Sequence, residues 1–139
     1  MKDVAIVSYC RTGIGKAQRG ALNMTHGIPM TAHVLRRAIE RAAIEGSEVE
    51  DVVVGCGLPE GATGHNIGRN AALDAGLGTH VPGMTINRYC GSGITAISIV
   101  ASRIAAGELT TAIAAGVESI SLVQFNLKDR KSTRLNSSH

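Results

Sequence analysis

A single cysteine carries the clearest chemical signal in this sequence. Cys90 lies in the stretch Pro82–Gly93, which reads PGMTINRYCGSG and directly precedes a segment rich in isoleucine and alanine. The pattern predicts a strand that turns sharply into a helix, with the thiol at the turn. The first amides of a helix have no partner within it, and their dipoles favour an anion such as a thiolate. The same amides could hold the oxyanion that forms when sulfur attacks an acyl group.

A structural role for Cys90 is the alternative, because free cysteine is among the most buried residue types. Gly91 and Gly93 favour a reactive thiol, since they leave the backbone bare for a substrate to approach. The residues alone leave both interpretations open. Cys10 and Cys56 follow apolar runs with no helix directly behind them, so a buried structural role is favoured for both.

The elements around this turn are expected to alternate between strands and helices. Strands are predicted over Val4–Ser8, Asp51–Cys56, Pro82–Asn87 and Thr110–Ala115, and helices over residues 30–45, 67–75 and 90–106. Pro29 and Asn66 stand where the first two helices would begin, and Gly46 and Gly76 where they would end. This alternation is typical of an α/β fold with a mostly parallel sheet and helices on both faces.

The helix predicted over residues 90–106 is apolar on nearly all sides, and its only charged residue is Arg103. Ile94 and Ile97 lie on one face, and Ile99 and Val100 on the other. A helix of this kind is expected to be buried on both sides, whereas a single sheet covers only one. We therefore expect the chain to form part of a thicker sandwich.

Composition excludes several classes of function for a chain of 139 residues. Residues 128–139 carry the whole net charge of +3, and aromatic residues make up only 2%, so nucleic acid and anionic membranes are not expected partners. Three widely spaced cysteines do not suggest a disulfide framework or a metal site. A cytoplasmic protein with reduced thiols is expected.

Several motifs together resemble the thiolase family. The stretch Asn87–Gly93 (NRYCGSG) is followed at residues 114–119 by AAGVES, and the chain opens with RTGIGK at residues 11–16. The loop GHNIGR at residues 64–69 is similar to the family's Gly-Gln-Asn-x-x-Arg loop, with His65 in place of glutamine. The resemblance runs from about residue 3 to residue 124.

The resemblance implies an acyl-CoA C-acyltransferase of fatty acid metabolism. Such enzymes cleave 3-ketoacyl-CoA by thiolysis, or run the reverse Claisen condensation, and Cys90 matches their catalytic nucleophile. Coenzyme A thioesters would be the substrates, with no cofactor, and the parent enzyme would be a homodimer or homotetramer. The family's activating histidine and second cysteine lie in Gly-His-Pro and Cys-x-Gly-Gly-Gly motifs, and neither motif occurs in this sequence.

The same resemblance predicts a thiolase-like layered sandwich of which this chain is the N-terminal half only. Residues 1–127 would form a partial thiolase N-terminal domain, and residues 128–139 a disordered tail that looks foreign to the family. Two alternatives stay open at this point. The chain could be an inactive fragment without enzymatic function, or its parent could be a decarboxylating ketosynthase of the same superfamily.

Overall fold

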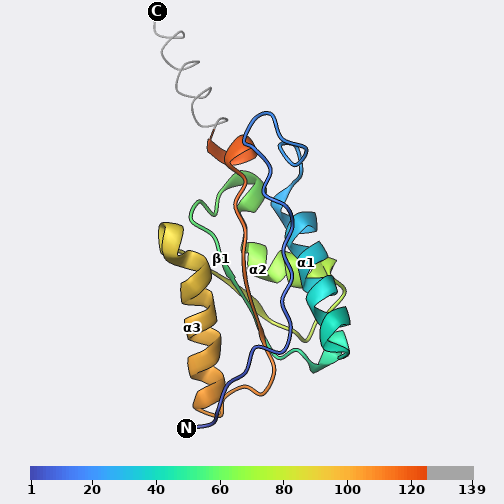
Figure 1. Cartoon of the computed structure of the whole chain (residues 1–139), viewed down its shortest axis with the longest axis vertical. Coiled ribbons are helices and arrows are strands. Elements are labelled where there is room, and N and C mark those ends of the chain that lie inside the picture. Colours follow the sequence, from blue (N-terminus) through green and yellow to red (C-terminus); the bar gives the residue numbers. More distant parts are fainter. Residues whose placement is uncertain (125–139) are drawn as a thin grey trace, which may run out of the picture.

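The structure is a computed structural model that describes residues 1–124 (Figure 1). In this part of the chain, three strands form one parallel sheet, with β1 (Val52–Gly55) between β2 (Gly83–Ile86) and β3 (Ile113–Gly116). The predicted parallel sheet is therefore confirmed for the three later strands. The predicted tail at residues 128–139 lies outside the described residues.

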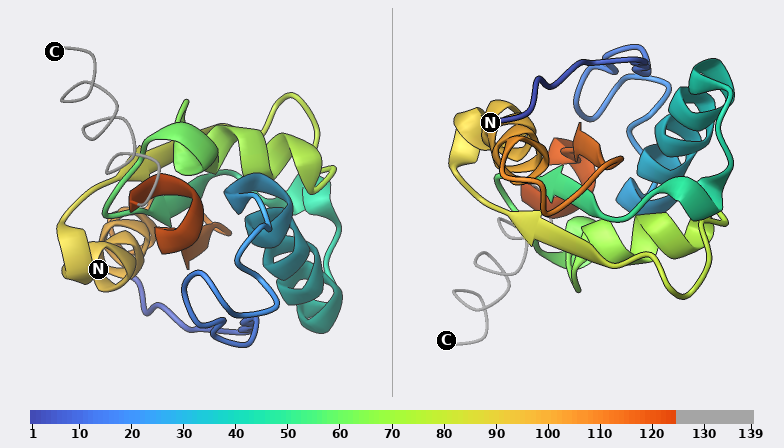
Figure 2. Two further views of the ribbon diagram at one scale, coloured as in Figure 1. Left: turned by 90° about the horizontal axis from the view of Figure 1, so that it is seen from above. Right: turned by 90° about the horizontal axis from the view of Figure 1, so that it is seen from below.

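Helices cover both faces of the sheet, as predicted (Figures 1 and 2). They are α1 (Gly27–Ala42), α2 (Ile67–Asp74) and α3 (Ser92–Ala105), joined in part by the 3₁₀ turns Gly46–Glu48, Gly61–Thr63 and Tyr89–Gly91. Successive side chains of a strand point to opposite faces. Val53 accordingly packs with α3, whereas Val52 and Val54 join a larger core with α1 and α2.

Helix α1 differs from the prediction at both ends. It begins at Gly27, where the ring of His26 accepts a hydrogen bond from the amide of Ile28 and caps the first turn. It ends at Ala42 because Ala43 adopts a left-handed conformation with φ of 53°. The amide of Ala43 then bonds carbonyls of the last turn, a termination that usually uses glycine. Gly46, the predicted stop, instead begins a 3₁₀ turn.

The buried strand predicted over Val4–Ser8 is wrong. The segment forms no strand, and Val4, Ile6 and Val7 are 41%, 76% and 77% exposed. A groove of about 680 Å³ lies between the N-terminal residues, α1, α3 and the β3 edge of the sheet. Figure 2 shows the N-terminal segment crossing from α3 towards α1 on the side away from α2. Without a pairing partner, an apolar segment cannot become a sheet strand.

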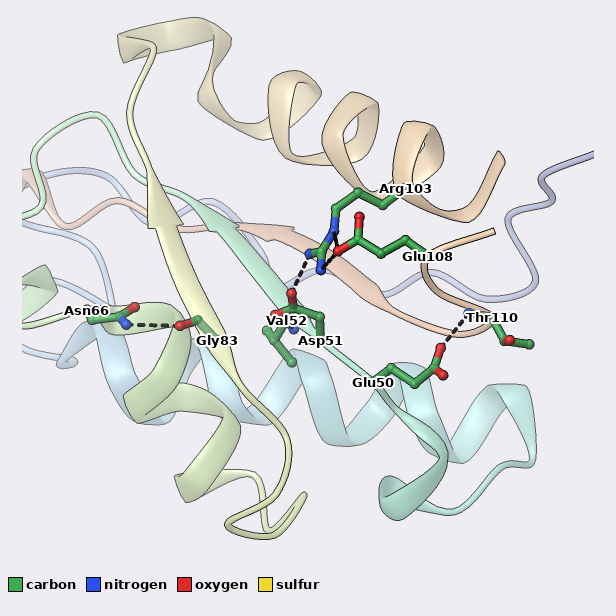
Figure 3. Close-up of polar contacts among 8 residues, drawn as sticks. All are labelled: Glu50, Asp51, Val52, Asn66, Gly83, Arg103, Glu108 and Thr110. Carbon is green, nitrogen blue, oxygen red and sulfur yellow. Dashed lines mark hydrogen bonds and ion pairs between the residues drawn. The ribbon is translucent and has the colours of Figure 1, made fainter. Parts of the chain in front are cut away.

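Polar side chains attach β1 to the segments beside it (Figure 3). The guanidinium of Arg103 on α3 pairs with the carboxylates of Asp51 and Glu108, which raises the pKa of Arg103 and lowers that of Glu108. The Glu50 carboxylate accepts hydrogen bonds from the amides of Thr110 and Thr111, which lower its pKa. These contacts hold the start of β1 beside the segment that leads into β3.

One asparagine attaches strand β2 to helix α2 (Figure 3). The Nδ2 of Asn66 donates to the carbonyl of Gly83 at 2.9 Å, at the start of β2. Its Oδ1 accepts from the Arg69 amide at 3.2 Å and so caps α2, as the sequence predicted. The same oxygen accepts from the hydroxyl of Thr85 at 3.1 Å. Asn66 therefore joins α2 and β2.

Helix α3 is covered by the sheet on one side only. Ala96 and Val100 face the sheet and are 0% and 7% exposed, whereas Ile94 and Ile97 face outward and are 69% and 42% exposed. The sequence correctly predicted a second apolar face, but the exposed side is that of Ile94 and Ile97, not that of Val100. No helix within residues 1–124 is long and apolar enough to span a membrane.

Candidate functional site

Cys90 is exposed and lies in the 3₁₀ turn Tyr89–Gly91, between the end of β2 and the first residue of α3. This is the position that the sequence predicted for it, at the junction of a strand and a helix. The alternative of a buried structural cysteine does not fit an exposed thiol. Cys56, by contrast, is fully buried at the end of β1, as expected, and Cys10 is half-buried.

Hydrogen bonds hold the turn from both ends. The side chain of Asn87 accepts from the amide of Tyr89 at 2.8 Å, and the carbonyl of Arg88 accepts from the amide of Gly91 at 2.9 Å. The hydroxyl of Ser92 accepts from the amide of Arg88 at 2.8 Å and donates to the carbonyl of Tyr89 at 2.7 Å. Tyr89 itself has a positive φ of 45°, which costs a residue with a Cβ atom roughly 1–2 kcal/mol.

One glycine allows the backbones of β1 and α3 to approach each other at this turn. A Cβ atom on Gly55 would lie 2.4 Å from the carbonyl carbon of Ser92, closer than any side chain can tolerate. Gly93 has the opposite surroundings, because no atom lies within 4 Å of the position its Cβ would take. The start of α3 is therefore pressed against the end of β1 on one side and open on the other.

An open recess of about 300 Å³ lies beside Cys90. The residues that line it are Gly55, Tyr89, Cys90, Ser92, Gly93, Gly116, Val117 and Glu118. No histidine is among these lining residues in the part of the chain that the structure describes. The recess therefore offers a thiol, bare backbone and one carboxylate, but no imidazole to activate the sulfur.

Glu118, the carboxylate in this recess, is engaged with the end of β1. Its Oε1 accepts a hydrogen bond from the amide of Gly57, and its Oε2 lies 3.9 Å from the Sγ of Cys56. Burial, and to a lesser degree the Glu118 charge, raise the pKa of the Cys56 thiol. Glu118 thus caps a loop amide just beyond β1.

The geometry fits a nucleophilic thiol that an acyl group can reach. The sulfur belongs to the turn that leads into α3, and no side chain caps the start of this helix. The backbone around Cys90 is rich in glycine. Amides at a helix start are suited to holding an oxyanion, although those of Gly91 and Ser92 bond the carbonyls of Arg88 and Tyr89 here. Sequence reasoning missed the strained Tyr89 and the bonds made by Ser92. A Ser that follows a Cys-Gly pair at a predicted helix start was the available signal for Ser92, whereas nothing in the sequence predicts a left-handed tyrosine.

Comparison with known proteins decides the family. The family model described as "Thiolase, N-terminal domain" matches residues 4–139. The chain belongs to the thiolase family. It is 40% identical over 123 residues to a 3-ketoacyl-CoA thiolase of Bacillus subtilis (strain 168), covering 88% of this chain and 32% of that relative. It is also 40% identical over 137 residues to an acetyl-CoA acetyltransferase of Escherichia coli (strain K12), covering 97% of this chain and 34% of the relative.

Solved structures of thiolases share the fold described above. The chain superimposes on the Acat5 thiolase from Ascaris suum, solved in complex with coenzyme A, with a TM-score of 0.83 and 32% identity, covering 88% of this chain and 31% of that one. A Bacillus anthracis acetyl-CoA acetyltransferase gives a TM-score of 0.80 and 35% identity over 85% of this chain and 29% of its own. The thiolase-like fold is thus confirmed, and the chain spans about a third of the length of these relatives.

Proposed function

We propose that this thiolase chain carries the nucleophile of an acyl-CoA C-acyltransferase, and that the sulfur of Cys90 accepts the acyl group to form the acyl-enzyme. The observation that carries the proposal is the exposed thiol in the turn before α3, in a chain of this family. Relatives named 3-ketoacyl-CoA thiolase and acetyl-CoA acetyltransferase support the same reaction class, since the two names describe cleavage and transfer of acyl groups on coenzyme A.

The proposed cleavage has two steps. The Cys90 thiolate attacks the ketone carbon of a 3-ketoacyl-CoA, and the bond between that carbon and C2 breaks. The electron pair stays on C2 of the departing acetyl-CoA, which takes up a proton, while the shortened acyl group remains on sulfur as a thioester. The thiolate of a second coenzyme A then attacks this thioester and displaces Cys90. A covalent intermediate thus divides one difficult carbon–carbon cleavage into two easier steps.

The 139-residue chain by itself is proposed to react at Cys90 without completing this cycle. The proton transfers need a base to activate the thiol and an acid to protonate C2. The family motifs that would supply a histidine and a second cysteine do not occur in the sequence. We therefore expect the chain to be modified at Cys90 by a thiol reagent, and to produce no acetyl-CoA from acetoacetyl-CoA.

The experiment measures both alkylation of the cysteines and turnover of acetoacetyl-CoA. The purified chain is treated with iodoacetamide and digested, and alkylation is measured for the peptides of Cys10, Cys56 and Cys90 separately. Cys90 should react fastest. Turnover of acetoacetyl-CoA should equal that of a Cys90→Ala variant. An open reading frame that restores the length of the relatives should gain turnover, and its own Cys90→Ala variant should lose it. A full-length enzyme that stays active without Cys90 would refute the proposal.

The remaining features of the function rest mainly on the family. We propose coenzyme A thioesters as the substrates, no additional cofactor, and a homodimeric or homotetrameric whole protein in the cytoplasm. The outward face of α3 around Ile94 and Ile97 supports an additional covering layer, because exposed contiguous apolar surface commonly marks an interface. Light scattering on the full-length protein would give its subunit number.

A further inference from the structure

The turn that carries Cys90 adopts a conformation that its own backbone disfavours. Tyr89 is 73% exposed, so packing does little to fix it, yet its φ is 45°. A left-handed residue with a Cβ persists only where the surroundings hold it there. Some group must therefore hold the peptide that leads directly into Cys90.

Ser92 provides that group. Ser92 is only 3% exposed. Its hydroxyl accepts a hydrogen bond from the amide of Arg88 and donates one to the carbonyl of Tyr89. The two partners flank the strained φ,ψ pair of Tyr89, and Ser92 stands two residues beyond Cys90. The Ser92 side chain therefore connects the start of α3 to the two residues before Cys90, and the thiol of Cys90 takes no part in these bonds.

The other serines of α3 show that this contact is specific to position 92. Ser98 and Ser102 belong to the same helix and are exposed. Ser98 is thus a matched control: it has the same side chain in the same helix, remote from the turn. The turn is also held by the backbone bond from the Gly91 amide to the Arg88 carbonyl, and by Asn87, whose side chain accepts from the Tyr89 amide.

We propose that Ser92 is a positioning residue for Cys90, acting through the strained turn and not on the substrate. The inference rests on the proposed function, in which the Cys90 thiol is the acyl acceptor. The Ser92 hydroxyl keeps Tyr89 in the left-handed conformation, and so keeps the Cys90 thiol at the open start of α3 beside the recess. The chemistry needed is a small side chain that both donates and accepts a hydrogen bond, which threonine shares and valine lacks.

The rate of Cys90 alkylation by iodoacetamide at neutral pH, read from its own peptide, tests this in the 139-residue chain. Ser92→Ala should slow the reaction about five-fold, the equivalent of one hydrogen bond of about 1 kcal/mol. Ser98→Ala should react at the rate of the unmodified chain. Adding Tyr89→Gly to Ser92→Ala should restore most of the rate, because glycine takes a positive φ without strain.

A second pair of variants separates positioning from a general loss of folding. Thr and Val have nearly the same shape, so Ser92→Thr should keep the rate and Ser92→Val should lose it. Equal rates for these two variants would overturn the proposal, as would a Ser92→Ala chain that reacts at the original rate. A loss of rate in Ser92→Ala that Tyr89→Gly leaves unchanged would overturn it as well.

Failure of this inference is distinguishable from failure of the proposed function. The alkylation series reports only where the thiol stands, whereas acyl transfer is read from the turnover of the full-length enzyme. An enzyme indifferent to Cys90→Ala would refute the nucleophile and leave the alkylation series unaffected. Equal alkylation rates across the Ser92 variants would refute the positioning role and leave Cys90 as the nucleophile.

Discussion

Two valine-containing segments of similar composition have opposite outcomes in this molecule. Val52–Gly55 forms the central strand β1 and its valines are fully buried, whereas Val4–Ser8 remains outside the sheet with most of its apolar side chains exposed. Both segments are short apolar runs bounded by turn residues. The local sequence pattern therefore does not distinguish a segment that forms the central strand from one that stays outside the sheet.

The difference lies in the neighbours. β1 has a paired strand on either side and helices above and below, and side chains of Glu50 and Asp51 attach its start to the chain beside it. The N-terminal segment has one backbone bond, from Lys2 to Ala105, and side-chain contacts to α1. Burial of an apolar run thus requires partners for its backbone before its side chains can contribute.

The largest loss of stability is expected for Gly55→Ala, at the end of β1. The new Cβ would meet the backbone of Ser92 and Gly93, which cannot rotate away as a side chain can. We expect a loss of about 3 kcal/mol in the free energy of unfolding, measured by urea denaturation, at the upper end for an overpacked core. Gly13→Ala is the control, because no atom lies within 4 Å of its Cβ position and it should change stability little.

A matched pair of valines compares the two segments directly. Val53→Ala removes methyl groups at a position that is 0% exposed and should cost about 2 kcal/mol. Val7→Ala removes the same atoms at a position that is 77% exposed and should stay within about 0.5 kcal/mol of the original chain. Similar losses for the two variants in the same denaturation assay would show that the N-terminal segment is buried in solution.

The pattern of the sequence was sufficient where each element carries its own signals. The sequence was enough to predict the strand Val52–Gly55, the cap at Asn66, and the position of Cys90 between a strand and a helix. Turn residues and apolar periodicity, on which these predictions depend, are local features. The family likeness was also readable, since the NRYCGSG stretch and the motifs around it keep their order and spacing.

Other features depend on contacts that no local pattern encodes. The ends of α1 depend on the His26 cap and on the left-handed Ala43, where the sequence offered Pro29 and Gly46 as more obvious signals. The open side of α3 could not be chosen because both of its faces are apolar. At the site, the strain at Tyr89 and the bonds of Ser92 follow from how the turn closes in three dimensions.

A smaller effect is expected where the attachment of β2 to α2 is removed. Asn66→Ala deletes the cap of α2 and the bond to Gly83, and leaves alanine at a φ of 55°. We expect a loss of about 1.5 kcal/mol, mostly from the cap and the strain. Asn66→Gly tolerates the positive φ and should recover part of it. Equal stability of Asn66→Ala and the original chain would show that the sheet does not depend on this attachment of β2 to α2.

The smallest effect concerns the attachment on the β3 side and depends on pH. The amides of Thr110 and Thr111 lower the pKa of Glu50 from its ordinary value of 4.5. A carboxyl group whose pKa is lower in the folded state adds stability above its unfolded pKa, and loses it as the pH falls through the folded value. Glu50→Gln should therefore reduce stability slightly at neutral pH and converge with the original chain at a pH below about 4.5. The same gap between the two chains at both pH values would mean that the carboxylate charge does not help to hold β1 beside the segment leading into β3.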